Sequence, residues 1–314
     1  MSKMEILEKD ESRKVGVARV DGGAVVAKTG VTLWSDARRR FSKNKLAMLG
    51  LLIVVCVILV AATAPVIAPY DPVKIDTANL DKTSLQPPSL RHPMGTDIFG
   101  RDIFSRIIWG SRVSLEVGIV AVGIMIILGL VFGAVAGYYG TFLDAIVMRL
   151  ADIFFAFPYV LGAILLITIM GRGLRNTFIA IGILGWPTIA RIFRSSILSV
   201  KETDYVEAAR ALGASDLRII IKHILPNSIA PIIVYGTMAV GGAIITEAAL
   251  SFLGLGVQPP KPAWGYMLAD SRSYFATAPW LMWFPGLAIV ITVLGFMLLG
   301  DGLRDAIDPR MKAD

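Results

Sequence analysis

The sequence VGIVAVGIMIILGLVFGAVAGYYGTFL, residues 117–143, contains no Asp, Glu, Lys or Arg. About 20 mainly apolar residues in a helix are enough to cross the hydrocarbon core of a membrane. Further charge-free stretches lie at Leu46–Tyr70, Ile153–Gly171, Asn176–Ala190, His223–Thr246 and Ser273–Gly300. The sequence therefore predicts an all-α polytopic membrane protein with about six transmembrane helices, of which the fourth, Asn176–Ala190, is the weakest.

The composition excludes several other classes of protein. Of the 314 residues, 55% are hydrophobic and only 18% are charged, and the mean hydropathy is +0.67. A soluble domain carries about 25% charged residues, so too few polar groups remain here to cover a water-facing surface. A soluble enzyme, a disordered chain and a collagen are excluded, and the single cysteine, Cys56, rules out an internal disulfide.

The distribution of basic residues predicts the orientation. With the N-terminus in the cytoplasm, the segments on the cytoplasmic side hold 21 of the 31 Lys and Arg residues. This excess follows the positive-inside rule, so we expect both termini in the cytoplasm. Topology thus accounts for the net charge of +7 and for the basic N-terminal tail without a nucleic-acid partner.

The predicted organisation follows from these spans. It comprises a cytoplasmic tail at 1–45, a first transmembrane helix at 46–70, an external loop at 71–112, a transmembrane core at 113–300 with a cytoplasmic loop at 200–226, and a cytoplasmic tail at 301–314. The first helix is too long for a signal peptide and is expected to be retained. After His92 and Pro93, the apolar residues of the external loop approximate helical spacing. Either an interfacial helix that enters the second span or an amphipathic helix packed on protein fits this spacing.

The cytoplasmic loop predicts two short helices joined by a turn. The run Glu-Ala-Ala-Arg-Ala-Leu at 207–212 has high helix propensity. Gly213 suits the left-handed residue that ends a helix, and Ser215 suits the cap of the next helix. Pro226 is expected to break that second helix before the fifth span begins. Small alanines that permit close approach make the first helix a candidate docking surface, and its rigidity would transmit a partner's movement to the attached spans.

Four blocks of sequence, in order, resemble one family. The spacing of Glu207-Ala208-Ala209, Gly213 and Leu225-Pro226 resembles the coupling loop of ATP-binding-cassette (ABC) importer permeases. Further blocks resemble the C-type permease of dipeptide and oligopeptide importers, and they lie at Gly95–Leu115, Asp144–Pro158 and Glu247–Gly265. The resemblance covers roughly Trp34 to Pro309. One departure is His223, which stands where the coupling-loop pattern has an aliphatic residue.

The resemblance implies a type I importer permease fold and a set of partners. The chain would form a heterodimer with a second permease, dock on two cytoplasmic ATPases and receive substrate from an external binding protein, in a prokaryotic plasma (inner) membrane. By resemblance, the ATPases would contact Tyr205, Glu207, Ala208, Ala209, Leu212 and Gly213. The sequence has no phosphate-binding loop of the Gly-x-x-x-x-Gly-Lys-Ser/Thr type, so ATP and magnesium would bind the partner ATPases. Peptides are the expected cargo, with nickel, glutathione or another small solute as alternatives.

Charged residues within or near the spans are the remaining candidates. Glu116 and Glu247 lie near the outer ends of the second and fifth spans, where they either line the translocation path or gate, or pair and cap structurally. Arg149 and Asp152 are three residues apart on the third span and are expected to form a structural ion pair. No catalytic constellation and no metal site are visible, so we expect a transport subunit rather than an enzyme. The more distant alternative is a channel or an ion-gradient carrier with acidic residues as proton carriers.

Overall fold

The structure of the protein, a computed structural model, describes residues 33–75, 77 and 79–307. This part of the chain is helical and contains no β-strand, and its one β-bridge joins Thr96 to Asp102. The expected tails at 1–45 and 301–314 lie mostly outside the described residues. Their described portions are largely helical, since α2 occupies Leu33–Lys43 and the last helix continues to Ile307.

Five helices are long and apolar enough to cross a membrane, and a bent pair of helices, counted as one span, brings the number to six. In chain order the spans are α3 (Lys45–Ile67), α5 (Ile103–Ala134) with the π-helical η1 (Val135–Tyr139), the pair α6 (Thr141–Ala156) and α7 (Tyr159–Met170), α8 (Leu174–Val200), the run α10 (Asp216–Ile219), η2 (Ile220–Ile224) and α11 (Leu225–Phe252), and α13 (Trp280–Ile307). Short elements between them are α4 (Leu80–Thr83), α9 (Asp204–Ala211), α12 (Trp264–Ser271) and η3 (Arg272–Tyr274). The predicted count of about six spans is confirmed.

The third span is the interrupted one. Its two helices, α6 and α7, meet at an angle of 93°. Phe157, between them, is extended, with φ −95° and ψ 135°, because the ring of Pro158 disfavours a helical conformation in the residue before it. The expectation that the fourth span is the weakest in apolar character is confirmed, since α8 has the lowest hydropathy of the five long helices. It is also the most buried of the five: 56% of its most apolar stretch is buried, against 22% for α3.

No separate interfacial helix precedes the second span. Instead, α5 begins at Ile103 and continues without a break into the membrane-spanning part. Asp102 caps its first turn, since one carboxylate oxygen accepts a hydrogen bond from the backbone N–H of Ser105 at 2.8 Å. Ile103 is buried in a cluster with Trp264 of α12 and Leu281 of α13. The residues after Pro93 thus enter the first turns of α5, which pack on α12 and α13, and the second span begins at residue 103.

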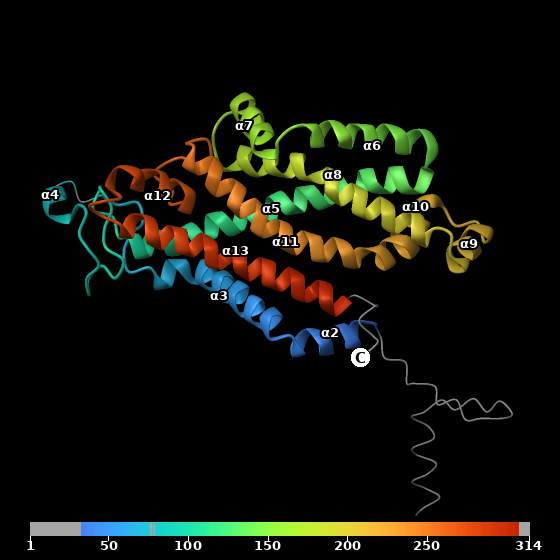
Figure 1. Cartoon of the computed structure of the whole chain (residues 1–314), viewed down its shortest axis with the longest axis horizontal. Coiled ribbons are helices and arrows are strands. Elements are labelled where there is room, and N and C mark those ends of the chain that lie inside the picture. Colours follow the sequence, from blue (N-terminus) through green and yellow to red (C-terminus); the bar gives the residue numbers. More distant parts are fainter. Residues whose placement is uncertain (1–32, 76, 78, 308–314) are drawn as a thin grey trace, which may run out of the picture.

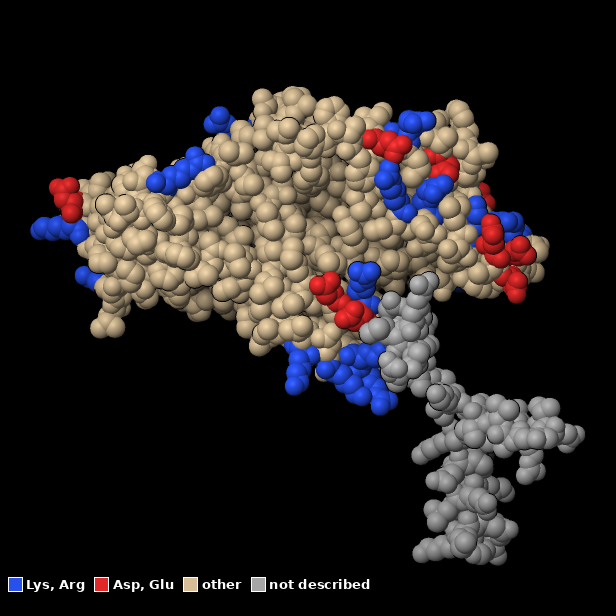
Figure 2. All heavy atoms as spheres, viewed as in Figure 1, with Lys and Arg blue, Asp and Glu red and all other residues tan. Residues whose placement is uncertain are grey.

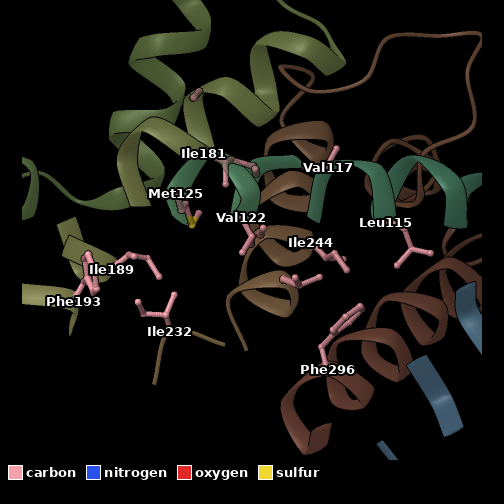
Figure 3. Packing of buried hydrophobic residues seen from close by; sticks show 14 of the residues in the cluster. Leu115, Val117, Val122, Met125, Ile181, Ile189, Phe193, Ile232, Ile244 and Phe296 are labelled. Carbon is pink, nitrogen blue, oxygen red and sulfur yellow. The ribbon is translucent and has the colours of Figure 1, made fainter. Parts of the chain in front are cut away.

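Close packing of α5 on α8 forms the centre of the bundle. Gly129, Gly133 and Gly137 repeat at intervals of four and face α8, where a Cβ on Gly129 would lie 2.4 Å from Cβ of Ile189. Such small residues let two helices approach closely in a membrane. Figure 3 shows the apolar side chains that fill the space around this contact, among them Met125 and Phe193.

Charged residues lie mainly toward the two ends of the molecule. In Figure 2 they lie near both ends of the elongated shape and along the lower edge, and a wide uncharged area separates the two groups, as expected where a chain faces lipid. In Figure 1, α4 and α12 lie at one end and α9 at the other, and α2 and the end of α13 lie in the half of the molecule that contains α9. Both ends of the described chain therefore lie in the same half as the loop that joins α8 to α11.

Candidate functional site

The loop between α8 and α11 folds as a helical elbow, which we define as residues 203–219. The helix α9 ends in a Schellman motif: the N–H of Ala214 bonds the carbonyl of Ala209 at 3.1 Å, and the N–H of Gly213 bonds that of Arg210 at 3.0 Å. This motif requires a left-handed residue, and Gly213 has φ +77°. The helix α10 follows after Ser215. The predicted helix, glycine turn and second helix are confirmed.

The expected break at Pro226 is wrong. Pro226 occupies the first turn of α11, and the chain passes from α10 into α11 through the π-helical η2. Proline has no N–H to donate, and the wider turn accommodates it: the N–H of Leu225 bonds the carbonyl of Ile220, five residues back. Asn227 donates its side-chain amide to the carbonyl of His223 at 2.7 Å. The elbow is consequently continuous with the fifth span.

The elbow has one anchored face and one exposed face. Val206 and Ile219 are fully buried in the main hydrophobic core, and they hold the elbow to the bundle. Of the residues predicted to contact an ATPase, Ala209 is half-buried and the others are exposed: Tyr205, Glu207, Ala208, Leu212 and Gly213. Leu212 is 88% exposed. An apolar side chain of this size in water, beside small alanines and charges, is typical of a surface that a partner covers.

Two ion pairs tie α6 to α8 near the elbow. Asp144 accepts two hydrogen bonds from the guanidinium of Arg194, and Asp152 pairs with Arg191. The expected pair of Arg149 with Asp152 is therefore wrong. Spacing within one helix identified the carboxylate but not its partner, which lies 39 residues further along the chain.

The two carboxylates at the outer ends of the spans differ in their surroundings. Glu247 is fully buried and accepts a hydrogen bond from the hydroxyl of Ser251 at 2.6 Å. The Ser251 oxygen in turn accepts one from the N–H of Val257 at 3.1 Å, which supports the structural interpretation of Glu247 as a group that fixes the end of α11. Glu116 is exposed and borders a cavity of about 590 Å³ beside Trp109 and Lys261.

A buried polar cluster at the outer end was not anticipated. Asp97 accepts a hydrogen bond from Nε of Arg101 at 2.6 Å, and the guanidinium of Arg106 lies 3.7 Å from the same carboxylate. His92 joins this cluster, with Nδ1 3.0 Å from Oδ1 of Asp102. The only sequence signal for this cluster was the block beginning at Gly95.

Asp270 of α12 lies near this cluster. Burial raises the pKa of its carboxyl group above the ordinary value, against the hydrogen bond from Tyr266 and the positive charges of Arg101 and Arg106. Within the described residues no group of three or more His, Cys, Asp or Glu side chains could hold a metal ion.

Solved structures and sequence families identify the class that this architecture defines. Two inward-facing structures of the MetNI methionine ABC transporter match with TM-scores of 0.54 and 0.52, at 20% and 22% identity, over 66% and 65% of this chain and 98% and 96% of theirs. The likeness establishes the type I importer permease fold. Residues 129–313 match the family described as the inner membrane component of binding-protein-dependent transport systems, and residues 32–88 match the N-terminal transmembrane domain of oligopeptide transport permease C. The chain belongs to this family of inner-membrane transport components.

Relatives with assigned names are similar over nearly the whole length. The dipeptide transport permease DppC of Alkalihalophilus pseudofirmus is 48% identical over 91% of this chain and 92% of its own. The oligopeptide transport permease OppC of Bacillus subtilis is 44% identical over 91% and 93%. The glutathione transport permease GsiD of Pectobacterium atrosepticum is 45% identical over 90% and 93%.

Proposed function

We propose that the chain is the permease subunit of an ATP-driven importer of di- or oligopeptides, and that it forms half of the translocation pathway. The observation that carries this proposal is the similarity, over about nine tenths of the chain, to permeases named for dipeptide and oligopeptide transport. Glutathione is the second candidate, because a relative named for its transport is 45% identical. The chain itself is not an enzyme in this proposal, and ATP and magnesium bind the partner ATPases.

The elbow is the proposed contact with an ATPase. Its exposed face presents Tyr205, Ala208 and Leu212 in the same half of the molecule as both ends of the described chain, which in the proposed orientation is the cytoplasmic side. Closure of two ATPases on ATP would move the elbows of this chain and of a second permease. Because each elbow is helical and continuous with a span, its displacement passes to the bundle and opens the pathway outward. Hydrolysis then returns the pathway to the inward-facing state.

The outer end of the second span is the better candidate for contact with cargo. Glu116 is exposed at the cavity beside Trp109, whereas Glu247 is closed off from solvent in this conformation. The carboxylate of Glu116, at this cavity, would contact the amino terminus of a peptide delivered by an external binding protein.

Reconstitution of the whole complex tests the proposal. The chain is expected to copurify with a second permease and two ATPase subunits, and proteoliposomes are expected to take up a radiolabelled dipeptide only with ATP and the external receptor. Competition by unlabelled glutathione or nickel separates the alternative cargoes. A chain that purifies alone and moves the dipeptide without nucleotide would refute the importer assignment.

Substitution of the elbow tests the docking surface separately. Ala208→Trp adds bulk where close approach is required and is expected to abolish copurification of the ATPases. Ala276→Trp is the matched control, since Ala276 is also exposed but lies in the connection between η3 and α13. Figure 1 shows the start of α13 at the end of the molecule away from α9. If both variants retain the ATPases equally and transport at the parent rate, the elbow is not the docking surface.

A further inference from the structure

The corner between α5 and α6 contacts the elbow through Tyr138. This residue lies in η1, at the end of α5, and its hydroxyl donates a hydrogen bond to Oδ1 of Asp216 at 2.7 Å. Asp216 is the first residue of α10. The two residues are 78 positions apart in sequence, and Figure 1 shows the end of α5 beside α10. The elbow is therefore connected to a third span in addition to α8 and α11.

Tyr138 contacts the elbow on both sides of the Gly213 turn. The guanidinium carbon of Arg210, on α9, lies 6.0 Å from the centre of the Tyr138 ring, at the outer limit of a cation–π contact. Arg210 precedes the turn and Asp216 follows it, so one tyrosine side chain meets both helices. A third contact joins the same corner to the start of the elbow, because Nζ of Lys201 donates to the carbonyl of Gly137 at 3.4 Å.

The corner that carries Tyr138 is packed too tightly to absorb a displacement. Gly137 is buried against α8, and a Cβ on it would lie 2.9 Å from Cβ of Ile197. On the far side of the corner, the pair of Asp144 with Arg194 fixes α6 to α8. A close-packed interior transmits strain rather than dissipating it. A movement of α10 relative to the bundle must therefore either break the bond from Tyr138 or move the corner.

We propose that Tyr138 is a positioning residue that transmits movement of the elbow to the corner between the second and third spans. This inference rests on the proposed function, in which ATPase subunits move the elbow. Without the tyrosine hydroxyl, the corner would receive less of the displacement than α8 and α11, because only the contacts of Arg210 and Lys201 would remain. Transport would then become less tightly coupled to ATP hydrolysis, while the elbow keeps its shape through Val206 and Ile219.

The test uses the full complex in proteoliposomes with Tyr138→Phe, which keeps the ring and removes only the hydroxyl. We expect the amount of radiolabelled dipeptide taken up per ATP hydrolysed to fall by about two- to tenfold, the range that loss of one solvent-exposed hydrogen bond allows. Subunit assembly and the basal rate of ATP hydrolysis are expected to stay at the parent level. Tyr139→Phe is the matched control, because Tyr139 is adjacent and exposed, and its hydroxyl has no hydrogen bond within the described chain.

Substitutions of Asp216 separate transmission from a structural role. Asp216→Ala is expected to lower the uptake per ATP as Tyr138→Phe does, and the double variant is expected to be no worse than either single variant. Asp216→Asn retains an acceptor oxygen and is expected to restore most of the ratio. If Tyr138→Phe keeps the parent ratio, or if either variant loses its ATPase subunits, the transmission role is refuted and the importer assignment stands. A parent complex that takes up dipeptide without ATP would refute both.

Discussion

Adding one methyl group to the α5–α8 contact, by Gly129→Ala, is expected to destabilise the bundle. The new Cβ would lie 2.4 Å from Cβ and Cγ2 of Ile189 and 3.1 Å from the backbone nitrogen of Ala190. Carbon atoms that are not bonded prefer a separation of about 3.5–4.0 Å, so α5 and α8 must move apart by about 1 Å. Overpacking costs about 1–3 kcal/mol, and replacement of glycine by alanine within a helix returns about 0.5–1 kcal/mol. The net loss of stability is therefore about 1 kcal/mol, within limits of about 0 and 2.5 kcal/mol.

Gly123→Ala supplies the matched control on the same helix. Gly123 has no atom within 4 Å of the position of its Cβ. Only the stabilisation from replacing glycine by alanine within a helix therefore applies there. The full-length chain in detergent would be unfolded with increasing mole fractions of SDS, and helicity would be followed by circular dichroism. We expect Gly129→Ala to unfold at a lower mole fraction than the parent and Gly123→Ala at an equal or higher one. Equal midpoints for the two variants would refute the assignment of this contact as the tight centre of the bundle.

Three other changes have defined outcomes. Arg194→Gln is expected to cost about 1–2 kcal/mol because it breaks a partly buried bidentate pair with Asp144, whereas Arg191→Gln at the more exposed pair should cost less than about 1 kcal/mol in the same SDS titration. Ser251→Ala is expected to cost about 1–3 kcal/mol because it leaves Glu247 and the N–H of Val257 unpaired, while Glu247→Gln, which keeps the acceptor, should retain the parent stability and uptake. The raised pKa of Asp270 means that its ionised form is penalised in the folded protein, so stability falls as pH rises from the unfolded to the folded pKa. Asp270→Asn should accordingly raise the unfolding temperature at pH 7, with a gain that vanishes below about pH 4, and an equal gain at both pH values would contradict this.

Local signals in the sequence were sufficient for the elbow and for the number of spans. The elbow depends on neighbouring residues: a run of strong helix formers, then a glycine in the left-handed conformation that alanine avoids. The spans depend on length and on the absence of charge. The bend in the third span also had a local cause, Pro158, but a proline inside a helix and a proline at a break look alike until the tertiary structure separates them.

Contacts between segments that lie far apart in the sequence could not be predicted from local signals. Asp152 had a plausible partner three residues away, yet its actual partner, Arg191, comes from another helix. Glycines on the fifth span differ in the same way: a Cβ on Gly236 would lie 3.1 Å from Ile126, whereas Gly242 has no atom within 4 Å of its Cβ position. The tight series begins instead at Gly129 on α5. Which face of a helix meets a neighbour depends on the whole bundle. The buried outer cluster around Asp97 was missed because charged loop residues are usually solvated.

The unbroken course of the second span has a mechanical consequence. From Ile103 to Tyr139 it comprises 37 residues, and at 1.5 Å per residue it measures about 55 Å. Gly129, where it is pressed most closely on its neighbour, divides this rod into arms of about 39 Å toward the outer tip and about 15 Å toward the inner one. If the helix tilts as a rigid body about Gly129, its two ends move in opposite directions. A displacement of 1 Å at the inner end then becomes a displacement of about 2.6 Å at the outer end.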